Sequence, residues 1–304
     1  YFLVQYLNIR IRFEKLADGS DENGPSRDAR SNFDLDLEVE KAMQEAKITV
    51  EYQPLHRLSD GGVFGVELIV CWKHPSGQTI HLSPADFAML AQKWGMFFSV
   101  EEWVLRTACK QVAAWHRKHG PLVLSFNLSQ VQWMNPEFAQ TLRNVAVQAG
   151  YPYQLIEFEL SESMLTKQPS YADAVGVFVE QGLNLTVDAF GLSRQAASIF
   201  ETVPLNKIKL DAKLVANLER DASIRQLVKE TIDLASAHDI QVMADGVDSK
   251  SLRHTLRDLG CIVGQGAHFS VPLSSAQCEQ YLSKRAAMSL PNRPASVAHK
   301  VAMP

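Results

Sequence analysis

The sequence lacks a disulfide framework, a surplus of basic residues and a long apolar run. Its 304 residues include only four cysteines, with neither a dense nor a CxxC spacing, which favours free thiols in a reducing cytoplasm. The formal net charge of −4 gives no electrostatic reason to expect a nucleic acid polymer or an anionic membrane as a partner. No apolar stretch approaches the ~20 residues of a membrane helix, and no signal peptide is visible.

What the sequence does contain is enough apolar material for a large core, since 46% of its residues are hydrophobic and 21% are charged. The chain starts at Tyr1 rather than Met, so we expect a piece of something longer. Alternation of apolar and polar residues over 7–13 is typical of a half-buried strand, and a polar Gly- and Ser-rich stretch follows it. We therefore expect four parts: the tail of an upstream domain or a strand (1–16), a linker (17–33), a compact domain (34–283) and a loop-like C-terminal tail (284–304).

Strand-like and helix-like stretches alternate through the compact domain. The strands are nearly continuous in apolar residues, and a helix near 100–120 has one apolar face made by Val104, Ala108, Val112 and Trp115. Eight such strands separated by helices predict an α/β fold of the TIM (β/α)8 barrel type. A doubly wound sheet is the alternative, but no GxGxxG loop follows its first strand.

Polar residues stand at or near the C-terminal ends of these strands, which converge on one mouth in a barrel. They are Glu67, Asn127, Glu159, Asp188, Lys209, Asp211, Asp245 and Gln265. Four of these, Glu67, Asn127, Glu159 and Asp188, offer oxygen ligands of the kind that hard cations such as magnesium, manganese or calcium prefer. Taken one by one, each acid could instead form a turn or cap a helix, Lys209 could pair with an acid, and Gln265 could satisfy backbone groups.

The chain resembles the EAL-domain family over about residues 37–282. The resemblance rests on eight separated motifs: YQPL (52–55), GVELIVCW (65–72), FNLS (126–129), EFELSES (157–163), VDAFG (187–191), KIKLD (207–211), ADGVDS (244–249) and GCIVGQG (260–266). It implies a modified TIM barrel with an antiparallel first strand. It also implies descent from bacterial metal-dependent phosphodiesterases that linearise the second messenger cyclic di-GMP.

The resemblance assigns roles to individual positions. Glu67, Asn127, Glu159 and Asp188 would hold one Mg²⁺ or Mn²⁺. Lys209 would contact the attacking water or the phosphate, Gln265 would support the site, and Glu162 would brace the loop that begins at Asp188. The candidate ligand-binding set is Gln53, Leu68, Lys209, Asp211 and Gln265, and the vestigial catalytic set is Glu67, Lys209 and Asp245.

Four positions depart from the family pattern. Cys71 stands where the family has an arginine that grips the ligand phosphate, and a thiol makes no bidentate ionic contact. Ala189 replaces the second aspartate, which is a ligand of a second metal, so that metal site is expected to be lost. Asp245 and Asp248 replace glutamates, and a displacement of about 1 Å in a catalytic group can cost about a hundredfold in rate.

These departures predict a degenerate EAL domain that acts as a non-catalytic regulatory or signalling module through protein contacts, with cyclic di-GMP as a candidate ligand. Two alternatives stay open: a weak metal-dependent cyclic di-GMP phosphodiesterase and a ligand-free interaction scaffold. The expected partners are a protein or an upstream GGDEF-type or sensor domain, and a homodimer stays open. The expected location is the bacterial cytoplasm, with a tether of the full-length protein to the inner membrane left open.

Overall fold

The structure is a computed structural model that describes residues 48–73, 79–83, 86–87, 97–129, 132, 134–135, 137–167, 171–191 and 196–289. The expected upstream segment (1–16), the linker (17–33) and most of the C-terminal tail (284–304) lie outside these residues. Among the described helices, none is both long and apolar enough to cross a bilayer.

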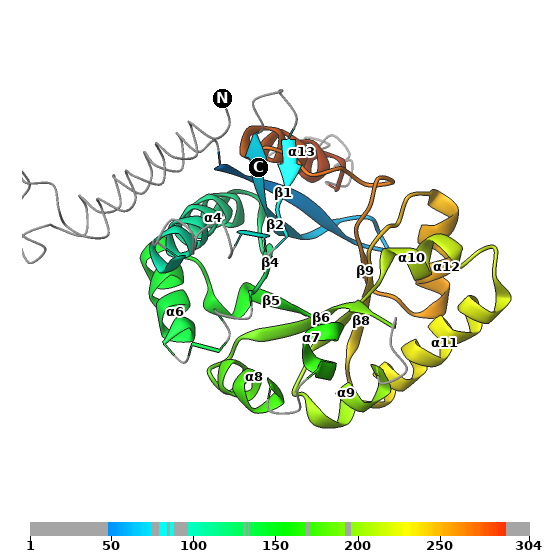
Figure 1. Ribbon diagram of the computed structural model, residues 1–304. Coiled ribbons are helices and arrows are strands. Elements are labelled where there is room, and N and C mark those ends of the chain that lie inside the picture. The colour runs from blue at the N-terminus through cyan, green and yellow to red at the C-terminus, as the bar shows by residue number, and fades with distance from the viewer. Residues whose placement is uncertain are drawn as a thin grey trace, which may run out of the picture.

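Eight strands close into a barrel, drawn in Figure 1 with helices around it. In chain order they are β1 (Ile48–Arg57), β2 (Val63–Lys73), β4 (Val123–Asn127), β5 (Ile156–Ser161), β6 (Asn184–Phe190), β7 (Lys207–Leu210), β8 (Gln241–Ala244) and β9 (Val263–Gly264). Strand β1 runs antiparallel to both of its neighbours, β2 and β9, and all other neighbouring barrel strands are parallel. The predicted modified TIM barrel with an antiparallel first strand is confirmed.

A ninth strand, β3 (Thr79–His81), pairs antiparallel with β2 and extends the sheet beyond the barrel wall. It was not predicted, because three residues are too few to show a period of two. Strand β3 places His81 directly opposite Cys71.

Helices surround the barrel (Figure 1). They are α4 (Phe97–His119), α6 (Phe138–Ala149), α7 (Glu162–Lys167), α8 (Tyr171–Glu180), α9 (Ala196–Thr202), α10 (Ala212–Asn217), α11 (Ala222–Ala237), α12 (Lys250–Leu259) and α13 (Ser275–Ser289), with a 3-10 turn η2 (Tyr153–Leu155). The helices of ten residues or more before residue 260 follow the apolar periodicity of the sequence. The short helices α7, α9 and α10 do not, since six or seven residues span less than two full turns.

The apolar face expected on α4 is buried: Val104, Ala108, Val112 and Trp115 are each at most 4% exposed. Trp115 packs edge-on against Tyr52 of β1, with ring centroids 4.8 Å apart. Burial of Val104 and of Val112 contributes about 1.5–3 kcal/mol each, so α4 is anchored firmly to the outside of the barrel.

Helix α13 packs against β1 and α4 and continues past residue 283, where we expected a loop-like tail to begin. Its residues Cys278 and Leu282 are buried in the core, and Glu279 pairs with Lys118 of α4. These anchors hold the helix in place although its own apolar periodicity is weak. The barrel unit therefore includes helix to Ser289.

Candidate functional site

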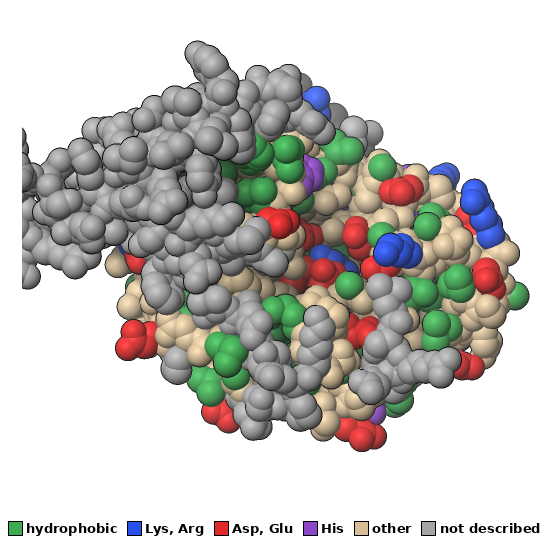
Figure 2. Space-filling view, viewed as in Figure 1, with side chains coloured by type: hydrophobic (Ala, Val, Ile, Leu, Met, Phe, Trp, Pro, Cys, Tyr) green, Lys and Arg blue, Asp and Glu red, His purple; other side chains and the backbone are tan. Residues whose placement is uncertain are grey.

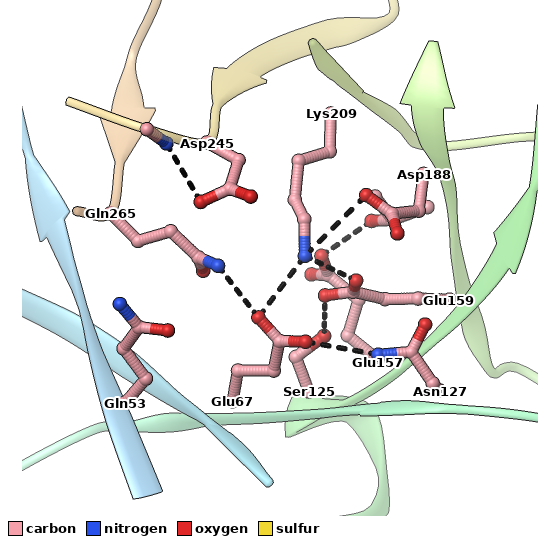
Figure 3. Close-up of polar contacts among 12 residues, drawn as sticks. Gln53, Glu67, Ser125, Asn127, Glu157, Glu159, Asp188, Lys209, Asp245 and Gln265 are labelled. Carbon is pink, nitrogen blue, oxygen red and sulfur yellow. Dashed lines mark hydrogen bonds and ion pairs between the residues drawn. The ribbon is translucent and has the colours of Figure 1, made fainter. Parts of the chain in front are cut away.

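The C-terminal ends of the parallel strands bring polar side chains together at the mouth of the barrel. Figure 2 shows acidic and basic side chains in the hollow at the middle of this face, and Figure 3 shows their contacts. We call Glu67, Glu159, Asp188, Asp245 and Lys209 the mouth cluster. A cavity of ≈ 430 Å³ opens beside it, and its lining includes Glu67, Asn127 and Asp188.

Lys209 lies at the centre of the mouth cluster. Its Nζ is 2.5 Å from Glu159 Oε2, 3.1 Å from Glu67 Oε2 and 3.7 Å from Asp188 Oδ1. Burial alone would lower the pKa of Lys209, but the three carboxylates outweigh it and raise that pKa well above the ordinary value. The lysine is therefore a permanent cation surrounded by acids.

Glu159 shows that one lysine does not balance these acids. The side chain is fully buried, and Ser125 Oγ donates a hydrogen bond to Oε1 at 2.5 Å. Burial, followed by the charge of Glu67, raises the pKa of Glu159 to about 8, although Lys209 opposes the shift. A second cation at the cluster would favour the ionised carboxylate.

Glu67 connects the cluster to two amide side chains. Asn127 Nδ2 donates to Glu67 Oε1 at 2.9 Å, and Gln265 Nε2 donates to Oε2 at 2.8 Å. Gln265 Oε1 is buried and has no hydrogen-bond partner. A buried acceptor without a partner, on an amide that contacts Glu67, suits a hard cation such as Mg²⁺ or Mn²⁺ with its bound water.

The C-terminal end of β6 carries Asp188 and Ala189. The β6–β7 register shifts between Val187 and Phe190, and Ala189 has a φ of 53°, in the left-handed region that non-glycine residues rarely adopt. Glu162 Oε2 accepts the N–H of Gly191 at 2.6 Å, which is the contact that a brace of this segment requires. The methyl group of Ala189 offers no ligand atom, so the backbone turn is present without a second carboxylate.

Asp245 and Gln53 lie at the edge of the mouth cluster (Figure 3). Asp245 Oδ1 accepts the Gly246 N–H at 2.7 Å, and burial raises the pKa of Asp245 against the opposing charge of Lys209. Gln53 faces Glu67 in the β1–β2 register, and its Nε2 donates to Ser270 O at 3.4 Å. Leu68 is buried and contributes to the cavity lining.

Two predicted residues make their described contacts outside the mouth cluster. Asp211, expected in the ligand-binding set, caps α10 by accepting the Lys213 N–H at 2.7 Å. An aspartate just before a helix is a favoured N-cap, and position at a strand end could not distinguish that use from ligand binding. Asp248 Oδ1 accepts the Ala267 N–H at 2.9 Å and so holds a loop.

Sequence reasoning missed Glu101 of α4, which also lines the cavity. The residue is 2% exposed, Ser129 Oγ donates to its Oε1 at 3.5 Å, and its buried Oε2 has no partner. Burial raises the pKa of Glu101 to about 8. A signal existed in the sequence, since residue 101 falls on the same helical face as Val104 and Ala108.

A known protein family and several known proteins match this sequence. The family model named EAL domain matches residues 36–272. An uncharacterized signaling protein of Caulobacter vibrioides is 32% identical over 238 residues, 78% of this chain and 29% of the relative. Cyclic di-GMP phosphodiesterase PA2567 of Pseudomonas aeruginosa is 30% identical over 234 residues, 77% of this chain and 40% of the relative. The chain thus spans well under half the length of these relatives.

The fold also matches solved structures. The PaMucR phosphodiesterase in complex with c-di-GMP aligns with a TM-score of 0.69 at 24% identity, covering 80% of this chain and 99% of that chain. The FimX EAL domain from Pseudomonas aeruginosa, bound to c-di-GMP, aligns with a TM-score of 0.65 at 21% identity, covering 79% and 96%. At these identities the likeness establishes the barrel fold.

Proposed function

The chain belongs to the EAL domain family, and from this membership we propose that it is a regulatory module that senses cyclic di-GMP at the barrel mouth with little or no turnover. The observation that carries the proposal is the contrast between two neighbouring residues. Asp188 points at Lys209 within an acidic cluster, whereas Ala189, in the same turn, has no ligand atom.

The residues present fit one metal ion. Glu67, Asn127, Glu159 and Asp188 would hold one Mg²⁺ or Mn²⁺, which would place positive charge near the phosphates of a bound dinucleotide. Lys209 pairs with Glu67, Glu159 and Asp188 at the mouth, and Glu162 accepts the Gly191 N–H just after the end of β6 that carries Asp188. These contacts support binding of an anionic ligand that brings or shares a cation.

Hydrolysis requires more than this arrangement offers. Cleavage of a phosphodiester by a two-metal site depends on one ion to activate water and another to stabilise the leaving oxygen. Ala189 removes a ligand for the second ion, Cys71 supplies no cation of its own, and Asp245 carries a shorter side chain than glutamate. Because these groups would act on one transition state, their joint loss removes most of the acceleration.

The decisive test incubates the purified chain with cyclic di-GMP and Mg²⁺ or Mn²⁺ and separates the products by chromatography. We expect no steady formation of the linear dinucleotide. Steady formation that Glu67→Gln abolishes, and that Glu180→Gln at an exposed position leaves intact, would overturn the proposal in favour of the weak phosphodiesterase. That alternative is supported by the intact contacts among Glu67, Glu159 and Lys209.

Calorimetric titration with cyclic di-GMP tests the sensing part. We expect binding that depends on Mg²⁺ or Mn²⁺ and is weakened by Glu67→Gln. The absence of binding at tens of micromolar would contradict the sensor proposal and support the ligand-free scaffold.

The remaining parts of the proposal concern the longer protein. We propose that residues 1–16 belong to an upstream unit, that 17–33 link it to the barrel, and that the barrel passes a signal to a GGDEF-type or sensor domain or to another protein. A homodimer is one way to form such a contact. The longer length of the related proteins supports a further unit in the longer protein.

A further inference from the structure

A second group of potential metal ligands lies on three adjacent antiparallel strands, β1, β2 and β3. None of its members belongs to the mouth cluster. Glu51 on β1, Cys71 on β2 and His81 on β3 each offer one ligand atom, and these atoms all lie within 4.8 Å of one another. Cys71 and His81 are directly opposed in the β2–β3 register. Glu51 pairs with Ile69, two residues before Cys71, so it is the diagonal neighbour of Cys71 on the same face.

We propose that Glu51, Cys71 and His81 bind a single Zn²⁺ ion. A thiolate, an imidazole and a carboxylate form a donor set that zinc prefers, whereas Mg²⁺ and Mn²⁺ prefer oxygen alone. The site is therefore chemically distinct from the oxygen donors of the mouth, and it stands independently of the proposed function.

The spacing of the three side chains fits tetrahedral coordination. With zinc bonds of about 2.0–2.3 Å, ligand atoms of a tetrahedral site lie about 3.3–3.8 Å apart. His81 Nε2 and Glu51 Oε2 are 3.3 Å apart. The Cys71 sulfur lies within 4.8 Å of both of these atoms, so coordination requires each distance to shorten by at most about 1.3 Å. The His81 side chain is 48% exposed and the Glu51 side chain is 20% exposed, so both can adjust toward the buried sulfur.

The exposed fraction of the side chain rises from Cys71 through Glu51 to His81, so the group is closed to solvent on one side and open on the other. Cys71 is fully buried, the Glu51 side chain is 20% exposed, and the His81 side chain is 48% exposed. Three protein ligands leave a fourth position for water or another ligand, as in zinc sites that are open to exchange. His81 also lines the ≈ 430 Å³ cavity, so the ion would stand at its rim.

Zinc binding changes the charge at this rim. The sulfur–zinc bond forms as the thiol proton leaves to solvent, and no electron is transferred. With a neutral histidine, the local charge changes from −1 for Glu51 alone to 0 for the zinc complex. An anion in the cavity then meets one less unit of negative charge.

The test uses the full chain, stripped of metal with a chelator and kept reduced, in excess Mg²⁺ so that oxygen-only sites are saturated. Titration with Zn²⁺ should show one equivalent bound, and Co²⁺ in its place should give a thiolate-to-cobalt absorption band. Cys71→Ser should abolish that band, and His81→Ala should weaken Zn²⁺ affinity at least ~10-fold. His254→Ala, at an exposed histidine of α12, is the matched control and should change neither.

Any of three results overturns the proposal: no Zn²⁺ bound above the Mg²⁺ background, a Co²⁺ complex without the thiolate band, or His81→Ala with unchanged affinity. His81 is exposed enough that its variant is expected to fold, which circular dichroism checks. Because no nucleotide is present, these results are independent of whether the chain binds cyclic di-GMP.

Discussion

Two buried glutamate–lysine pairs lie on the same strands, β5 and β7, two residues apart. Toward the mouth, Glu159 pairs with Lys209; one layer below, Glu157 pairs with Lys207. We call the lower pair the floor pair. Thr186 Oγ1 donates to Glu157 Oε1 at 2.5 Å, and Lys207 Nζ lies 4.8 Å from the centre of the Phe64 ring.

The two layers differ in charge balance rather than in residue type. The floor pair matches one carboxylate with one ammonium group, whereas the mouth cluster gathers Glu67, Asp188 and Asp245 around the same kind of pair. The balanced layer is typical of the N-terminal end of a barrel, which serves stability. The unbalanced layer favours a further cation, so the surplus of acid, and not the ion pair itself, indicates function.

The largest effect is expected from removal of the lysines. Lys207→Met leaves Glu157 buried without a cation, and we expect the free energy of unfolding to fall by about 3–5 kcal/mol. Added Mg²⁺ or Mn²⁺ should not restore it. Lys209→Met should also destabilise the protein, but here the divalent cation should restore part of the loss. Urea unfolding with and without metal measures both, and an equal response of the two variants to metal would contradict the comparison.

A smaller effect is expected from pH. Since burial and Glu67 raise the pKa of Glu159 from 4.5 to about 8, the folded protein holds this proton more tightly than the unfolded chain. The stabilisation is complete below pH 4.5 and is lost as the pH rises through about 8. We expect metal-free protein to lose stability steadily over this range.

Substitutions can assign the pH dependence of the unfolding free energy to individual residues. Glu159→Gln or saturating Mg²⁺ should reduce it, and Glu101→Gln should remove a further part, because the pKa of Glu101 is also raised to about 8. Glu180→Gln, at an exposed position, is the control and should leave the slope in place. Denaturant unfolding at several pH values measures this, and a slope that Glu159→Gln leaves unchanged would refute the charge imbalance.

The smallest effects are expected at Ala189. An L-residue in the left-handed region costs about 1–2 kcal/mol, and glycine removes this strain. Glycine also loses more conformational entropy on folding than alanine, so the net stabilisation from Ala189→Gly should be at most about 1 kcal/mol. Ala189→Asp adds a fifth acid to the mouth but should restore little hydrolysis, since Cys71 and Asp245 remain. Thermal unfolding and product analysis check the pair. Full activity from Ala189→Asp alone would show that those two departures matter less than we infer.

Much of the fold could be predicted because buried parallel strands and amphipathic helices leave regular apolar patterns. The same patterns placed Glu67, Glu159, Asp188 and Lys209 at strand ends, and these ends converge in any such barrel. The floor pair could not be recognised, since Glu157 and Lys207 lie within strands and only the closed barrel brings them together. The cap that Asp211 forms on α10 could not be recognised, because strand end and helix start share one residue there.

The antiparallel first strand decides at which end of the barrel β1 begins. In the β1–β2 register Ile48 lies opposite Trp72, at the same end of the barrel as the mouth cluster. A barrel with only parallel strands would receive the preceding chain at the floor. Here the preceding chain joins at the mouth, so a unit attached ahead of residue 48 could act on the cavity directly, without transmitting a change through the packed interior.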